Sequence, residues 1–166
     1  SNVSGTTRNI IKGIYNDTDT QIVFVDTPGI HKPINRLGKV LNKEALALTK
    51  DVDLILFVVD VASGIGNGDM FILESLKNND VPVILVLNKI DEITTEKLFK
   101  TIDEFKDIYP FVEVVPTSGL KNDNVDHLIS VIKKYLHDEV KYFPDEYYTS
   151  SSMKFMASEI VREKLL

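Results

Sequence analysis

Short apolar runs alternate along the chain with segments whose apolar residues recur at helical spacing. Two of the runs, at residues 54–59 and 83–87, are continuous and rich in β-branched residues, which is typical of strands buried on both faces of a sheet. A shorter run at residues 111–115 predicts a further strand. Helical spacing marks four segments, at residues 37–50, 69–79, 94–109 and 124–136. This alternation predicts an α/β fold with a doubly wound, mostly parallel sheet.

The N-terminal part of the chain follows a different pattern. Residues 9–16 and 21–25 predict two strands on either side of a polar turn, so we expect an antiparallel hairpin. One edge strand of the otherwise parallel sheet would then run antiparallel. Among the helices, Asp69 is expected to cap one, and Thr94 or Thr95 to cap another.

The C-terminal part does not continue the alternation. Residues 138–151 include Pro144 and predict a linker, and residues 152–166 have the apolar spacing of a helix. We therefore expect one domain over residues 1–137, then the linker, then the first helix of another domain.

Composition and charge narrow the possible functions. The 166 residues are 43% hydrophobic and 27% charged, with a net charge of −6, which is typical of a soluble globular protein without a broad basic surface. The chain contains no cysteine, which excludes disulfides and thiolate metal sites and fits a reducing cytosol. No apolar run has the length of a membrane span.

The strand at 83–87 is followed directly by Asn88, Lys89, Ile90 and Asp91. Ligands of open α/β sheets bind beyond the carboxyl ends of the strands, so this N-K-x-D tetrapeptide lies where a ligand would bind. The Asp91 carboxylate could accept the two hydrogen bonds that guanine N1–H and N2–H₂ donate, and adenine has no such pair of donors. The Lys89 stem could lie along the base, and the Asn88 amide could join neighbouring loops. A solvated loop is the alternative interpretation.

Another strand-end motif is Asp26-Thr27-Pro28-Gly29, which follows the hairpin. Its carboxylate could hold Mg²⁺, and its glycine would let a backbone N–H approach a phosphate oxygen. A plain Pro-Gly turn is the alternative.

Two small polar loops could complete a site at the same sheet edge. Thr7, or less favourably Thr6, could bind Mg²⁺ through its hydroxyl group. After the strand at 111–115, Ser118 could brace Asp91, and the Gly119 N–H could donate to guanine O6. For each loop by itself, an ordinary polar loop or turn is the default interpretation.

In their order and spacing, these motifs resemble the second to fifth sequence motifs of the translation-factor-related GTPases. More narrowly, the chain resembles the Era-type GTPases, which act in bacterial ribosome assembly. The resemblance covers nearly the whole chain and is carried by residues 6–9, 22–31, 82–85, 88–91, 143–147 and 155–165.

The resemblance implies a P-loop GTPase fold that binds GTP/GDP with Mg²⁺. Asn88, Lys89 and Asp91 would recognise guanine, and Ser118 and Gly119 would complete the base pocket. The family usually has alanine where Gly119 stands, a change that keeps the backbone donor.

The resemblance also implies the metal and phosphate ligands. Asp26 and Thr7 would hold Mg²⁺, Gly29 would contact the γ-phosphate, and residues 27–36 would form a switch segment. Ile30 stands where Ras-like GTPases keep a glutamine that orients the attacking water. Isoleucine has no hydrogen-bonding group, so slow intrinsic hydrolysis is expected.

One motif of the family is missing from these residues. The sequence has no G-x-x-x-x-G-K-[ST], and the glycine-rich stretch at 64–68 lacks the lysine. We therefore expect the fold to lack its first strand, P-loop and first helix, as in an Era-type chain truncated at both ends. Residues 152–166 would be the first helix of a KH-type RNA-binding domain.

The function that follows is GTP hydrolysis timing small ribosomal subunit assembly and rRNA maturation. The 16S rRNA contact would belong to the C-terminal domain, in a mostly monomeric, cytoplasmic protein. Peripheral attachment to the inner face of the cell membrane is left open. A non-catalytic module without nucleotide binding is one alternative, and a related GTPase of tRNA modification is another.

Overall fold

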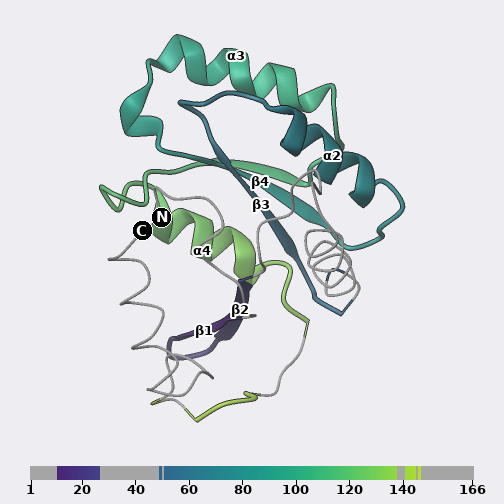
Figure 1. The fold of residues 1–166 in the computed structure, drawn as a ribbon. Coiled ribbons are helices and arrows are strands. Elements are labelled where there is room, and N and C mark those ends of the chain that lie inside the picture. The colour runs from purple at the N-terminus through teal and green to yellow at the C-terminus, as the bar shows by residue number, and fades with distance from the viewer. Residues whose placement is uncertain (1–10, 27–48, 50, 138–140, 145, 147–166) are drawn as a thin grey trace, which may run out of the picture. The chain divides into compact units, whose positions relative to one another are not determined.

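The computed structural model describes residues 11–26, 49, 51–137, 141–144 and 146 (Figure 1). The chain divides into two compact units, one of residues 46–137 and one of residues 1–45 with 138–166. The predicted helix at 37–50 and the predicted helix at 152–166 lie outside the described residues, apart from Thr49. The predicted domain boundaries at 138 and 152 stay predictions.

The unit of residues 46–137 is built on a parallel sheet of three strands in the order β3-β4-β5. These strands are β3 (Ile55–Asp60), β4 (Val83–Asn88) and β5 (Glu113–Pro116). Strand β4 lies in the middle, and its residues 83–87 are all buried. This burial explains why its sequence is a continuous apolar run and not an alternating one.

Helices cover both faces of this sheet, namely α2 (Asn67–Leu76), α3 (Thr95–Lys106) and α4 (Val125–Lys133) (Figure 1). Successive side chains of a strand point to opposite faces. Leu85 and Leu87 accordingly share a core with Leu73 of α2 and Phe105 of α3. Ile84 and Val86 pack instead with Val131 of α4. The predicted α/β fold is therefore confirmed for this unit.

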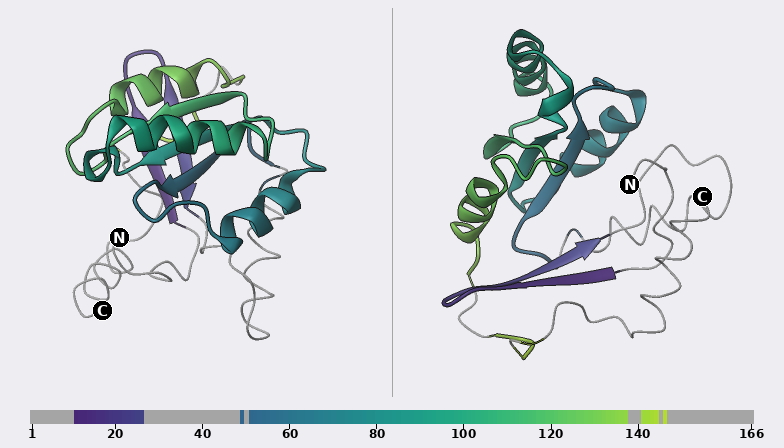
Figure 2. Two further views of the ribbon diagram at one scale, coloured as in Figure 1. Left: turned by 90° about the horizontal axis from the view of Figure 1, so that it is seen from above. Right: turned by 90° about the vertical axis from the view of Figure 1, so that its left-hand side faces the viewer.

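The hairpin belongs to the other unit and consists of β1 (Ile11–Asn16) and β2 (Gln21–Asp26). The strands pair antiparallel from Ile11 opposite Asp26 to Asn16 opposite Gln21, and a tight turn joins them (Figure 2). In the turn, Oδ1 of Asp17 accepts the N–H groups of Asp19 and Thr20 at 3.1 and 2.9 Å. The predicted hairpin is confirmed, and its turn depends on this aspartate side chain.

The side-chain amide of Gln21 joins the hairpin to residues 141–144. Its Oε1 accepts hydrogen bonds from the backbone N–H groups of Tyr142 and Phe143, each at 2.9 Å. Its Nε2 donates to the Phe143 carbonyl at 2.9 Å and to Oδ1 of Asn16 at 2.8 Å. One glutamine amide thus uses both acceptor positions and both N–H groups.

Two predictions about helix starts have different outcomes. Thr94 caps α3, because its Oγ1 accepts the Lys97 N–H at 3.3 Å. The prediction that Asp69 caps α2 is wrong: α2 has Gly66 as its N-cap, and Oδ2 of Asp69 accepts the Gly66 N–H at 2.7 Å. An aspartate stabilises a helix start from either position, so the local sequence does not separate the two.

Other element boundaries shift by a few residues. β5 begins two residues later than predicted, and Phe111 instead packs against the rings of Phe57, Phe105 and Tyr109, with centroids 5.0 to 6.2 Å apart. Helices α3 and α4 end three residues before their predicted ends.

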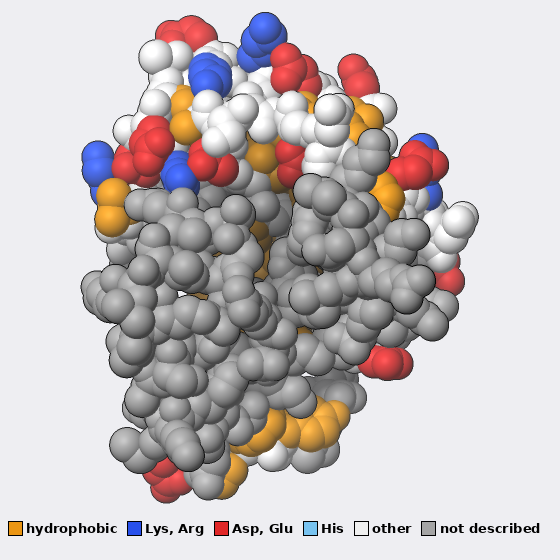
Figure 3. Space-filling model, viewed as in Figure 1, with side chains coloured by type: hydrophobic (Ala, Val, Ile, Leu, Met, Phe, Trp, Pro, Cys, Tyr) orange, Lys and Arg blue, Asp and Glu red, His pale blue; other side chains and the backbone are white. Residues whose placement is uncertain are grey.

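Acidic and basic side chains are interspersed on the face of the 46–137 unit that Figure 3 shows. Ion pairs between neighbouring residues of α3 include Lys106 with Asp103 at 3.1 Å, and both side chains are exposed. Such exposed pairs contribute little to stability. Of the helices in the described part of the chain, none is long and apolar enough to cross a membrane.

Candidate functional site

The carboxyl ends of β3, β4 and β5 meet at one edge of the parallel sheet. Asp60 pairs in register with Asn88, and Leu87 with Pro116. The pairing continues past the strand ends, because the Thr117 N–H donates to the Leu87 carbonyl at 2.8 Å. The loops that follow β4 and β5 therefore start from fixed backbone positions.

Asp91 and Ser118 come from two of these loops and touch directly. Asp91 lies in a short 3₁₀ helix, η1 (Ile90–Glu92), and its Oδ1 accepts a hydrogen bond from Ser118 Oγ at 2.5 Å. This bond is the main reason why the pKa of Asp91 lies below its ordinary value. The carboxylate is thus held ionised and oriented, as the sequence led us to expect of Ser118.

Burial and hydrogen bonds to both its backbone and its hydroxyl group fix the position of Ser118. It is fully buried, and its backbone exchanges two hydrogen bonds with Asp123, each at 3.0 Å. The Lys121 N–H also donates to Ser118 Oγ at 3.2 Å. A loop this closely bonded keeps the hydroxyl group aimed at Asp91.

Asn88 joins the end of β4 to the loop after β5. Its Oδ1 accepts the backbone N–H of Gly119 at 2.9 Å, which is the loop-joining role expected for this side chain. In this structure the Gly119 donor is therefore directed at Asn88, and its bond to guanine O6 stays a prediction. A Cβ atom at Gly119 would lie 3.6 Å from Asn88 Oδ1, an ordinary contact.

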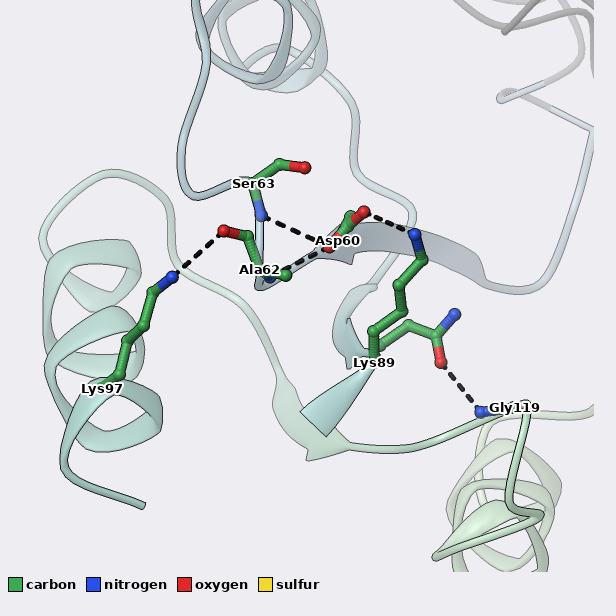
Figure 4. Close-up of polar contacts among 7 residues, drawn as sticks. Asp60, Ala62, Ser63, Lys89, Lys97 and Gly119 are labelled. Atoms are coloured by element: carbon green, nitrogen blue, oxygen red, sulfur yellow. Dashed lines mark hydrogen bonds and ion pairs between the residues drawn. The ribbon is translucent and has the colours of Figure 1, made fainter. Parts of the chain in front are cut away.

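Lys89 has a partner that the sequence analysis did not identify. Its backbone is left-handed, with φ 67° and ψ 37°, a region that non-glycine residues seldom occupy. Its Nζ lies 2.7 Å from Oδ2 of Asp60, and both side chains are 33% exposed (Figure 4). The contact raises the pKa of Lys89 and lowers the pKa of Asp60. Asp60 ends an apolar run just as Asn88 does, and that position was the signal that could have found it.

The other predicted site residues lie outside the part of the chain whose side chains the structure describes. Thr7, Thr27, Pro28, Gly29 and Ile30 lie outside the described residues. Asp26 is described only through its backbone, as the last residue of β2. Within the described part of the chain, no three His, Asp or Glu side chains gather as a metal site.

The model of one protein family, the 50S ribosome-binding GTPases, matches residues 1–89, which is more than half of the chain. The chain belongs to this family. Among curated relatives, GTPase Era of Clostridium kluyveri is 47% identical over 161 residues, which cover 97% of this chain and 55% of the relative. GTPase Era of Clostridium perfringens is 47% identical over 166 residues, covering 100% of this chain and 56% of the relative. The chain thus spans about half the length of the curated relatives it matches.

A solved structure of Era in complex with MgGDPNP and nucleotides 1506–1542 of 16S ribosomal RNA has the same fold. Its TM-score is 0.90 at 37% sequence identity, covering 99% of this chain and 56% of that one. The GTPase fold expected from the family resemblance is therefore confirmed.

Proposed function

We propose that this chain is the guanine-nucleotide-binding part of an Era-type GTPase that binds GTP and GDP with Mg²⁺ and hydrolyses GTP. The observation that carries the proposal is the Asp91 carboxylate, which Ser118 orients at the end of the central strand. The relatives' names and the nucleotide in the related structure support the same function.

The geometry around Asp91 suits guanine. Ser118 occupies one lone pair of Oδ1, and the carboxylate retains acceptor positions for two further donors. Guanine presents N1–H and N2–H₂ side by side, whereas adenine presents an acceptor at N1. With adenine bound, the Asp91 carboxylate would lack its two hydrogen-bond donors. The site would therefore strongly disfavour adenine nucleotides.

The metal and phosphate groups are assigned by family resemblance. Asp26 and Thr7 would hold Mg²⁺, which supplies positive charge to the β- and γ-phosphates. Gly29 would contact the γ-phosphate, next to Thr27 and Pro28, and Ile30 would leave the attacking water without a side-chain partner. We propose these roles on the D-x-x-G pattern of residues 26–29.

The biological step that we propose is assembly of the small ribosomal subunit in the cytoplasm. Support comes from the related Era structure, which holds nucleotides 1506–1542 of 16S rRNA. We propose that the RNA contact lies outside these residues, and the net charge of −6 supports this, because RNA-binding surfaces are usually basic. A monomeric state and peripheral association with the membrane belong to the same proposal.

Calorimetry on the full-length protein tests nucleotide recognition. Wild type should bind GDP in Mg²⁺ buffer, and Asp91→Asn should weaken GDP binding by at least about a hundredfold while binding xanthosine diphosphate better than GDP. Unchanged GDP affinity in this variant would overturn the role of Asp91. No heat with GDP in the wild type would favour a non-catalytic module.

A hydrolysis assay tests the proposed activity, and an RNA-binding assay tests the proposed biological step. The full-length protein should convert GTP to GDP and phosphate slowly, and it should bind a 16S rRNA fragment that contains nucleotides 1506–1542. Binding to unmodified tRNA with no affinity for this fragment would favour the GTPase of tRNA modification instead.

A further inference from the structure

Asp60 lies beside the guanine-recognition motif but belongs to none of the family motifs found in the sequence. It ends β3 and pairs in register with Asn88 at the end of β4. Its Oδ2 contacts the ammonium group of Lys89 at 2.7 Å. An acidic side chain from a different strand thus holds the second residue of the N-K-x-D motif.

Backbone hydrogen bonds hold the Asp60 carboxylate in place independently of Lys89. Its other oxygen, Oδ1, accepts the backbone N–H groups of Ala62 and Ser63 at 2.9 and 3.3 Å. The Ala62 carbonyl accepts a hydrogen bond from Lys97 Nζ of α3 at 3.0 Å, which ties the turn to a helix (Figure 4). Asp60 therefore presents Oδ2 from a turn that these three hydrogen bonds hold in place.

A fixed partner matters more for lysine than for most side chains. Lysine has many rotamers, and ordering them on binding opposes association. The backbone of Lys89 itself has left-handed dihedral angles, so the side-chain stem leaves the strand end in a set direction. With the ammonium group at Asp60, both ends of the stem are defined.

We propose that Asp60 is a positioning residue for guanine-nucleotide binding, which acts by holding the Lys89 side chain where its stem meets the base. The proposal rests on the proposed function. Among the described residues, Glu92 and Asp91 are the other acidic groups whose charge acts on Lys89. Without Asp60, pairing with Asp91 would occupy the carboxylate that reads the base, so this effect and the loss of order both weaken binding.

A double-mutant cycle on the full-length protein tests the proposal. Asp60→Asn keeps an oxygen for the turn and removes the charge that holds the lysine, whereas Lys89→Met keeps the stem and removes the ammonium group. GDP affinity measured by calorimetry should fall about two- to fivefold in Asp60→Asn, as expected for a partly exposed ion pair. In the Lys89→Met background, the same substitution should change GDP affinity by less than about 1.5-fold.

A structural role for Asp60 would give a different result. If Asp60 only stabilised the turn, its substitution would have the same effect with or without the Lys89 ammonium group, and that outcome would overturn the proposal. An unchanged GDP affinity in Asp60→Asn alone would also overturn it. Raising the salt concentration to about 1 M should shrink the ratio between wild type and Asp60→Asn, because salt screens partly exposed charges.

Asp103→Asn is the matched control. It removes an aspartate from another ion pair, that with Lys106 on α3, and should leave GDP affinity unchanged. Thermal unfolding of each variant checks that the fold is retained. If wild type binds GDP and Asp60→Asn does so equally well, the positioning role fails alone; if wild type does not bind GDP, the proposed function fails.

Discussion

Ser118 Oγ donates a hydrogen bond of 2.5 Å to Oδ1 of Asp91, across 27 residues of sequence. The serine is fully buried and the aspartate is partly exposed, so the contact joins the interior of the 46–137 unit to the sheet edge where its parallel strands end. This arrangement makes the orientation of the Asp91 carboxylate, which we propose reads the base, depend on the core.

Ser118→Ala should weaken GDP binding by about five- to tenfold in the full-length protein, because a hydrogen bond to an ionised group is stronger than a neutral one. Calorimetry with GDP measures the effect. Ser130→Ala is the matched control, since Ser130 Oγ donates only to the Asp126 carbonyl within α4. Equal affinities in all three proteins would contradict the orienting role.

The same bond should be visible in the titration of Asp91. The pKa of Asp91 is lowered from its ordinary value of 3.8, first by the Ser118 hydrogen bond. A lowered folded-state pKa stabilises the fold above the unfolded-state pKa, and this contribution is lost as pH falls through the folded-state pKa. NMR titration of the carboxyl carbon should show the pKa of Asp91 rising in Ser118→Ala, and no rise would exclude this cause.

Gly119→Ala should be tolerated. The added Cβ would make an ordinary contact with Asn88 Oδ1 at 3.6 Å, and the backbone at Gly119 has no positive φ. Replacing such a glycine restricts the unfolded chain and should stabilise the protein by about 0.4–1 kcal/mol. Denaturant unfolding measures this gain, and GDP affinity should stay within about twofold of wild type. A loss of stability would mean that the loop needs glycine.

Gln21→Ala should loosen residues 141–144 from the hairpin. The substitution removes four hydrogen bonds, two of them from the N–H groups of Tyr142 and Phe143. Each lost bond contributes about 1 kcal/mol, so amide hydrogen exchange at Tyr142 and Phe143 should accelerate.

Gln21→Glu separates the acceptor and donor roles of this amide. Glutamate still accepts the two N–H groups but has no hydrogen to donate to Asn16 Oδ1 or the Phe143 carbonyl. Exchange at Tyr142 and Phe143 should therefore lie between wild type and Gln21→Ala. Thr18→Ala, in the exposed turn of the same hairpin, is the control and should leave exchange there unchanged.

Local sequence rules do not by themselves determine which residue caps a helix. Thr94 was one of two adjacent candidates, and the structure selects it because its hydroxyl group reaches the Lys97 N–H. The predicted start of α2 was three residues too late, because the N-cap is Gly66 and Asp69 is the third helical residue. Aspartate at either position stabilises the first turn. Such choices depend on the path by which the chain enters the helix.

The sequence by itself determined the alternation of strands and helices, the hairpin, and the position of Asn88, Lys89 and Asp91 at a strand end. These features depend on side-chain periodicity and on the rule that ligands bind beyond the carboxyl ends of parallel strands. Both can be read from the order of neighbouring residues. Only the tertiary structure decided which partner each polar side chain has. Lys89 could pair with several acidic groups, and it pairs with Asp60 because the β3–β4 register brings that carboxylate to the same edge, a relation between strands that sequence spacing does not specify.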